Sequence, residues 1–141
     1  MATLRFHLDS TLTPAEVMRV LTDFSPARAE TWPTIDAEHF QVHQLGDTWA
    51  EVTEGTADAW ERVRYEWEPD ANTVVITTHD SKVFGPGGGW VFRTTPRGTG
   101  SRVDIELERH PSTLKSRMVA TILPFAAPVF RKSFKAPLKG I

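Results

Sequence analysis

Residues 102–129, RVDIELERHPSTLKSRMVATILPFAAPV, change their hydrophobic period part of the way along. At first apolar and charged residues alternate, with Val103, Ile105 and Leu107 on one face, as in a half-buried strand. Beyond Pro111 the large apolar residues recur every three or four positions, the period of a helix with one apolar stripe. That stripe consists of Leu114, Met118, Ile122, Phe125 and Val129. A strand followed by a long C-terminal helix is therefore predicted, with Met118, Ile122 and Phe125 facing a sheet.

The predicted C-terminal helix contains two helix-breaking residues. Ser112 can cap its start, and Pro124 and Pro128 interrupt its middle. Proline in a helix removes a backbone hydrogen bond and kinks the axis. We therefore expect either a bent helix or two helices in series.

The N-terminal part begins with a strand and continues into short helices. Residues 3–8 alternate between apolar and polar side chains. Thr13-Pro14-Ala15-Glu16 is a capping box with proline at the first helical position, followed by apolar residues at helical spacing up to Phe24. Ser25-Pro26 starts a second short helix, which must end before Pro33 because the residue preceding a proline avoids the helical region.

The middle of the chain is a series of strands joined by turns. Together with residues 3–8 they make seven, and sequential strands with short connections pair antiparallel. The sequence therefore predicts an α+β fold and one domain over residues 1–141: a seven-stranded curved antiparallel sheet gripping a long C-terminal helix, with two short helices after the first strand. Both sets of helices must cover the same face of the sheet. The other six strands are expected at 39–44, 48–54, 59–68, 73–78, 90–95 and 102–109.

Composition excludes several classes of function. The chain has no cysteine, which rules out disulfides, a thiolate metal site and a cysteine nucleophile, and favours a reducing compartment such as the cytoplasm. Its formal net charge of −2 supplies no basic field for nucleic acid. No apolar run has the length of a signal peptide or of a membrane-spanning helix.

The element order, together with four local stretches, resembles the START-like helix-grip superfamily, also called the polyketide cyclase/dehydrase and lipid-transport group. The stretches are residues 13–24, residues 60–67 (WERVRYEW), residues 80–87 (DSKVFGPG) and residues 100–103 (GSRV). The resemblance spans essentially the whole chain. It implies a cavity between the sheet and the long helix that takes a hydrophobic ligand, without identifying that ligand, because one fold hosts many functions.

The strand at 59–68 carries the candidate catalytic residues. Tyr65, the single tyrosine, shares the aromatic face that we expect to point inward, whereas Arg64 lies on the other face and pairs with a carboxylate such as Glu51. In a functional interpretation, Tyr65 would donate its hydroxyl to a ligand carbonyl, with one arginine assisting. The predicted ligand-pocket residues are Val63, Tyr65, Trp67, Trp90, Phe92, Ile105, Met118, Ile122 and Phe125.

Other motifs point to no chemistry. The histidines show no metal-ligand spacing, no GxSxG nucleophile motif occurs, and Gly85–Gly89 lacks the ending of a phosphate-binding loop. We predict no metal and no cofactor, and a flexible hairpin at residues 85–89 that could act as a lid.

Three functions remain open. The first is binding or transport of a lipid-like, aromatic or polyketide-like molecule, the second a cofactor-free cyclase or aromatase, and the third a regulatory module that binds a protein partner. The chain is expected to be a monomer or homodimer. Basic residues flank the apolar stretch of the C-terminal helix, a pattern that also allows contact with a membrane surface. They are Lys115, Arg117, Arg131, Lys132 and Lys135.

Overall fold

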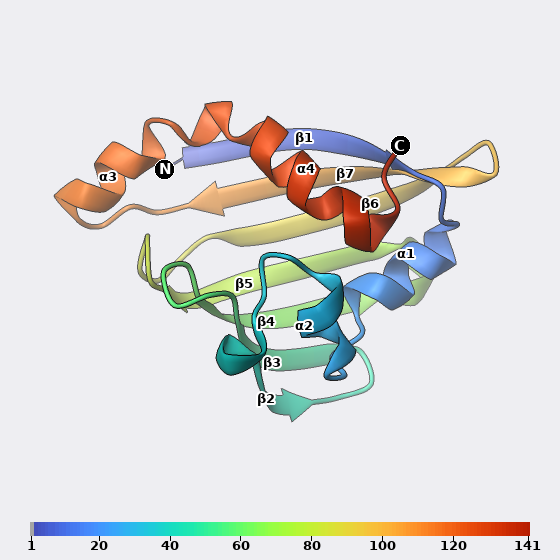
Figure 1. Cartoon of the computed structure of the whole chain (residues 1–141), viewed down its shortest axis with the longest axis horizontal. Coiled ribbons are helices and arrows are strands. Elements are labelled where there is room, and N and C mark those ends of the chain that lie inside the picture. Colours follow the sequence, from blue (N-terminus) through green and yellow to red (C-terminus); the bar gives the residue numbers. More distant parts are fainter. Residues whose placement is uncertain (1) are drawn as a thin grey trace.

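The sheet is continuous and its seven strands follow the order β1-β7-β6-β5-β4-β3-β2 within residues 2–141, the part of the chain that the computed structural model describes. All neighbouring strands pair antiparallel. The first strand therefore lies beside the last, and β1 and β2 form the two edges (Figure 1). The strands are β1 (Ala2–Ser10), β2 (Gln41–Leu45), β3 (Trp49–Glu54), β4 (Glu61–Glu68), β5 (Thr73–Ser81), β6 (Gly89–Arg97) and β7 (Gly100–Arg109).

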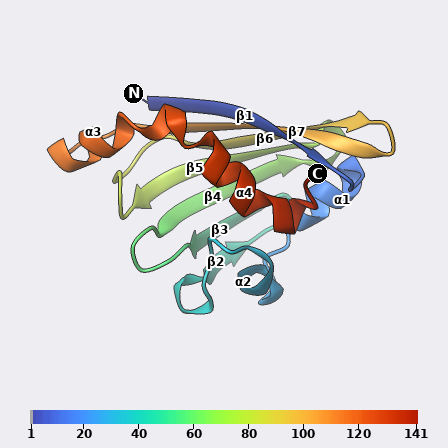
Figure 2. The same ribbon diagram turned by 45° about the horizontal axis from the view of Figure 1, so that its top comes forward.

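The helices lie on one side of this sheet. Figures 1 and 2 show α4 crossing the concave face, with α1 and α2 at one end of it and α3 extending past the other. The sheet thus supplies one wall of the interior and the helices the other. The helices are α1 (Pro14–Leu21), α2 (Ala27–Thr31), α3 (Leu114–Ala120) and α4 (Ala127–Leu138), with short 3-10 turns η1 (Ala37–His39), η2 (Pro69–Ala71) and η3 (Leu123–Phe125).

Local sequence signals account for the helix boundaries. The predicted capping box is present: the Glu16 backbone N–H donates to the Thr13 hydroxyl, and the Thr13 N–H donates to the Glu16 carboxylate. The C-terminal helix is divided into α3 and α4 by the proline-containing turn η3, as the prolines predict. The cap of α3 is Thr113 rather than Ser112.

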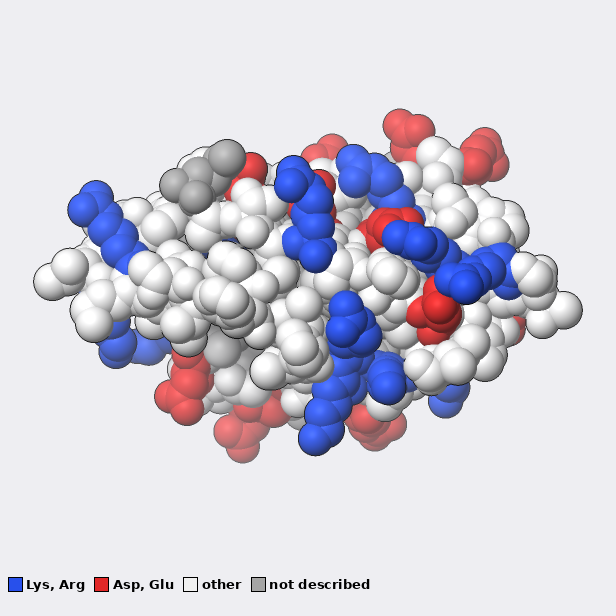
Figure 3. All heavy atoms as spheres, turned by 90° about the horizontal axis from the view of Figure 1, so that it is seen from above, with Lys and Arg blue, Asp and Glu red and all other residues white. Residues whose placement is uncertain are grey.

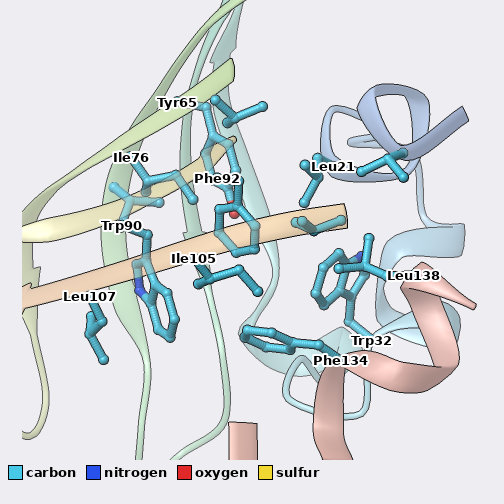
Figure 4. Close-up of a cluster of buried hydrophobic side chains, with 14 of the residues drawn as sticks. Leu21, Trp32, Tyr65, Ile76, Trp90, Phe92, Ile105, Leu107, Phe134 and Leu138 are labelled. Atoms are coloured by element: carbon cyan, nitrogen blue, oxygen red, sulfur yellow. The ribbon is translucent and has the colours of Figure 1, made fainter. Parts of the chain in front are cut away.

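The core lies between the concave face and the helices. Alternate residues of the strands are buried, among them Leu4, Phe6 and Leu8 of β1, which confirms the period-two patterns. Phe134 of α4 joins the two layers, because its ring lies 5.6 Å from that of Trp32 and 5.8 Å from that of Trp90, between ring centroids. Figure 4 shows Trp90 and Phe92 of the sheet directed toward Trp32 and Phe134 on the helical side.

Candidate ligand-binding cavity

A cavity of about 380 Å³ lies between the concave face of the sheet and the helices. It is lined by α1, α2 and the segment that follows α2, by β3 to β7, η3 and α4, by the connection between β3 and β4, and by Val83 and Phe84 ahead of the glycine-rich hairpin. A volume of this order is typical of sites that enclose a small molecule. Its aromatic lining consists of Trp32, Trp60, Tyr65, Phe84, Trp90, Phe92, Phe130 and Phe134.

One wall of the cavity holds a buried cluster of Arg28, Glu54 and Tyr65. Arg28 donates from Nε to a Glu54 carboxylate oxygen at 3.0 Å and from Nη2 to the Tyr65 hydroxyl at 2.8 Å. Tyr65 in turn donates its hydroxyl to the other Glu54 oxygen at 2.5 Å. The remaining Arg28 contacts, from Nη1 to the carbonyls of Leu21 and Asp23, join α2 to the end of α1 and to the connection between the two helices.

The protonation states in this cluster follow from its surroundings. Burial by itself disfavours a charged guanidinium, but the adjacent Glu54 and Tyr65 outweigh it and raise the pKa of Arg28. Burial also raises the pKa of Tyr65 well above its ordinary value, although the Arg28 cation opposes that shift. Tyr65 is therefore a neutral phenol whose single proton is already donated to Glu54.

A second polar cluster lies on another part of the lining. Arg109 of β7 forms an ion pair with Glu61 of β4 and donates from Nη1 to the Thr78 hydroxyl at 3.0 Å. Its guanidinium carbon lies 5.6 Å from the ring centroid of Phe84 and 5.9 Å from that of Trp90, within reach of a cation–π interaction. Arg109 is 5% exposed, and its Nε has no hydrogen-bond partner within residues 2–141.

Several predicted pocket residues occupy the inward face. Tyr65, Trp90 and Phe92 line the cavity. Val63 and Ile105 are buried in the surrounding core and are not part of the lining. Trp67 is half-buried, with its ring 5.9 Å from that of Phe24. The inward orientation predicted for residues 63, 65 and 67 is therefore observed, whereas ligand contact by these residues stays a prediction.

The predicted orientation of the C-terminal helix is wrong. Met118, Ile122 and Phe125 are 65%, 63% and 80% exposed and none lines the cavity. The segment carries a second stripe at helical spacing, which includes Leu123, Phe134 and Leu138, and this stripe is buried instead. Burying it places two phenylalanine rings, Phe130 and Phe134, against the aromatic residues of the sheet, whereas the exposed stripe contains only one phenylalanine, Phe125.

Arg64 lies outside the cavity. Its Nη1 donates to Glu51 at 3.0 Å on the neighbouring strand, and its guanidinium carbon lies 4.6 Å from the ring centroid of Trp49. The expected Arg64–Glu51 pair is confirmed. Since its side chain is on the convex face, Arg64 cannot assist Tyr65 with a ligand; Arg28 is the arginine next to that hydroxyl.

The four charged residues of the lining were absent from the predicted site, although three of them follow the alternation of their strands. Glu54 has the parity of buried Ala50 and Val52, and Glu61 has that of Val63. Arg109 likewise continues the face of Ile105 and Leu107. No local pattern marks Arg28, because the second short helix brings it to the sheet through tertiary packing.

Residues 2–141 form neither a metal site nor a membrane-spanning helix. No group of three or more histidine and acidic side chains in this part of the chain is arranged to hold a metal ion, so we assign no metal ligands. The described helices are all too short or too polar to cross a membrane.

Comparison with known proteins places the fold. No family model and no curated protein matches the chain in sequence. Among solved structures, a START superfamily protein from Mycobacterium smegmatis superimposes with a TM-score of 0.71 at 12% identity, covering 99% of this chain and 98% of that one. The Zhui aromatase/cyclase from Streptomyces sp. R1128 gives 0.69 at 12% identity, covering 97% of this chain and 88% of that one. A protein from Thermus thermophilus gives 0.73 at 13% identity, covering 97% of this chain and 92% of that one.

These similarities and the observed topology define the class of fold. The chain has the START-like helix-grip fold, with a seven-stranded antiparallel sheet, short helices after the first strand and a C-terminal helix on the concave face. At a sequence identity of 12–13%, structural similarity establishes the fold but not the function. The chemistry of a ligand therefore has to be inferred from the lining of this chain's own cavity.

Proposed function

We propose that this protein binds a hydrophobic small molecule in the cavity between the sheet and α4. The observation that carries the proposal is the space of about 380 Å³, whose lining is mainly aromatic and aliphatic. A cavity of this size could be closed by larger side chains, and leaving it open forfeits packing energy. The natural occupant is an apolar molecule whose burial offsets that loss.

The polar residues of the lining limit the chemistry of the ligand. Arg28 and Arg109 are both neutralised by carboxylates, Glu54 and Glu61, so the cavity does not demand a charged ligand. The Arg109 Nε–H lacks an acceptor within residues 2–141. An oxygen of the ligand, such as a carbonyl or hydroxyl oxygen, would satisfy this donor once the side chain shifted slightly. We therefore favour a mainly apolar, aromatic or lipid-like molecule that carries an oxygen acceptor.

Native mass spectrometry of the protein purified from its own host tests the proposal directly. We expect a stoichiometric adduct that is lost on denaturation and recovered in an organic extract. Its identity would then supply a ligand for titration. A clean apo mass, together with no binding of any compound from that extract, would contradict a carrier function.

A pair of adjacent substitutions on β5 distinguishes the cavity from the surface. Ile76 lines the cavity, whereas Val75 is 41% exposed on the opposite face. Ile76→Trp fills part of the space and should weaken binding of the extracted ligand by at least about tenfold. Val75→Trp adds the same side chain outside and should leave affinity unchanged. Equal affinities for the two variants would place the ligand elsewhere.

A cofactor-free aromatase or cyclase is the second candidate. It is favoured by the Tyr65 hydroxyl in the lining, next to Arg28 and Glu54, and by the likeness in fold to a protein described as an aromatase/cyclase. Because Tyr65 donates its proton to Glu54, it would have to exchange that acceptor for a ligand carbonyl. Tyr65→Phe should then abolish turnover of a polyketide-like substrate while sparing its affinity; equal turnover would exclude this role.

A further inference from the structure

The C-terminal segment has apolar side chains on two opposite faces, of which one is left uncovered. The inner face packs on the sheet through residues such as Leu123 and Phe134. A helical segment that is apolar on both faces normally has a partner on each. We call the uncovered set the outer stripe; its members are Leu114, Met118, Ile122, Phe125 and Val129, each between 63% and 80% exposed.

The outer stripe differs from the other exposed apolar residues in the described part of the chain. Val42, Leu45, Val75, Val83 and Ile141 are also exposed, but they are dispersed over the strands, a loop and the C-terminal residue. Single exposed apolar side chains are common and need no explanation, whereas a contiguous patch marks an interaction surface. The five large side chains of the outer stripe follow one another along α3, η3 and the start of α4 and form such a patch.

The charge distribution indicates what covers this patch. Residues 110–141 contain six lysines and arginines and no acidic residue, so all 18 acidic residues of the chain precede them. Figure 3 looks onto this side and shows a broad uncharged area over α3 and η3, with basic side chains at its outer end and over α4 and some acidic side chains along its lower border. The segment that carries the patch is therefore positively charged, on a chain whose net charge is negative.

We propose that the outer stripe and its flanking basic residues dock on an anionic lipid membrane, with the helices lying in the interface. Apolar side chains would enter the boundary between headgroups and acyl chains, and lysine and arginine would contact the anionic headgroups. A second copy of this chain is a poorer occupant. In a two-fold dimer the same basic residues, such as Lys132 and Lys135, would face each other and repel.

Docking in this orientation brings the cavity close to the lipid. Leu123 lines the cavity, while its neighbours Ile122 and Phe125 belong to the outer stripe. The turn η3 therefore separates the cavity from the membrane, and its displacement would open a path for an apolar molecule. The docking itself does not depend on a ligand in the cavity, so it is tested on the protein alone.

The test is co-sedimentation of the full chain with vesicles of phosphatidylcholine that contain about 30% phosphatidylserine, against vesicles of phosphatidylcholine alone. We expect binding to the anionic vesicles that weakens with added salt, and little binding to the neutral ones. Removing charge by Lys132→Gln and Lys135→Gln should weaken partitioning by roughly fivefold per residue. The double variant Ile122→Ser/Phe125→Ser should weaken it by at least about tenfold.

Leu45→Ser is the matched control, because Leu45 is 60% exposed but lies on β2 far along the sheet from α3. It should bind vesicles like the unmodified chain, and circular dichroism should show that every variant is folded. No binding of the unmodified chain to anionic vesicles would overturn the proposal. So would unchanged binding by the Ile122→Ser/Phe125→Ser variant, or a dimer in sedimentation velocity that this variant dissociates while vesicle binding persists.

Discussion

Tyr65→Phe removes one oxygen from the buried Arg28–Glu54–Tyr65 cluster and should destabilise the fold measurably. The hydroxyl accepts from Arg28 at 2.8 Å and donates to Glu54 at 2.5 Å, so two charge-assisted hydrogen bonds disappear. Each such bond contributes about 1.5–3 kcal/mol. Arg28 and Glu54 remain bonded at 3.0 Å, which limits the loss. We expect the free energy of unfolding to fall by about 2 kcal/mol and the melting temperature by about 6 °C.

Urea denaturation followed by tryptophan fluorescence measures this change, with the slope of the transition checked for constancy. Thr94→Val is the control, since the Thr94 hydroxyl is buried and has no hydrogen-bond partner within residues 2–141. Removing an unpaired hydroxyl should leave stability unchanged or slightly higher. If Tyr65→Phe also changes the free energy of unfolding by less than about 0.5 kcal/mol, the hydroxyl does not hold the cluster together.

Local geometry supports three further predictions. Burial raises the pKa of Tyr65 in the folded state, so the unfolded chain ionises first as the pH rises. The free energy of unfolding of the unmodified chain should therefore fall more steeply above about pH 10 than that of Tyr65→Phe. Urea denaturation at about pH 9 to 11.5 measures this difference. Thr13→Ala removes the cap of α1 and should lower the free energy of unfolding by about 1 kcal/mol in the same urea assay; no change would mean that the box is dispensable. Gly88 has φ of +76° and a Cβ there would lie 2.1 Å from the Glu108 carbonyl oxygen, so Gly88→Ala should lower the melting temperature far more than Gly98→Ala, where φ is +59° but nothing lies within 4 Å.

Most of the sheet could be predicted because successive side chains of a strand point to opposite faces. Val103, Ile105 and Leu107 are all buried, and the same rule holds for Val63 and Tyr65. Following the rule through to Glu54, Glu61 and Arg109 would also have placed these charged residues inward. Alternation alone does not predict their burial, because charged residues are usually solvated and only a partner on another element offsets the cost of burying them.

The C-terminal segment could not be oriented from its sequence. Large apolar residues occur on both of its faces, so helical periodicity alone is compatible with either face packing on the sheet. The ring of Phe134 fits against Phe6, Trp32 and Trp90, and this contact selects the inner face. Phe125 and the rest of the outer stripe are exposed as a consequence.

Sequence patterns alone predict the class of fold, the seven strands with the inward face of most of them, and the capped first helix. The prolines also predict an interruption of the C-terminal helix, whereas β2 is exposed at every residue and has no inward face. Each of these features depends on residues close together in the chain, because local backbone geometry and the spacing of apolar residues are enough to specify it. Tertiary structure decided the lining of the cavity, the pairing of Arg28 with Glu54 and the exposure of the outer stripe. Those features depend on which surfaces meet across the core, where packing and the pairing of buried charges outweigh local preference.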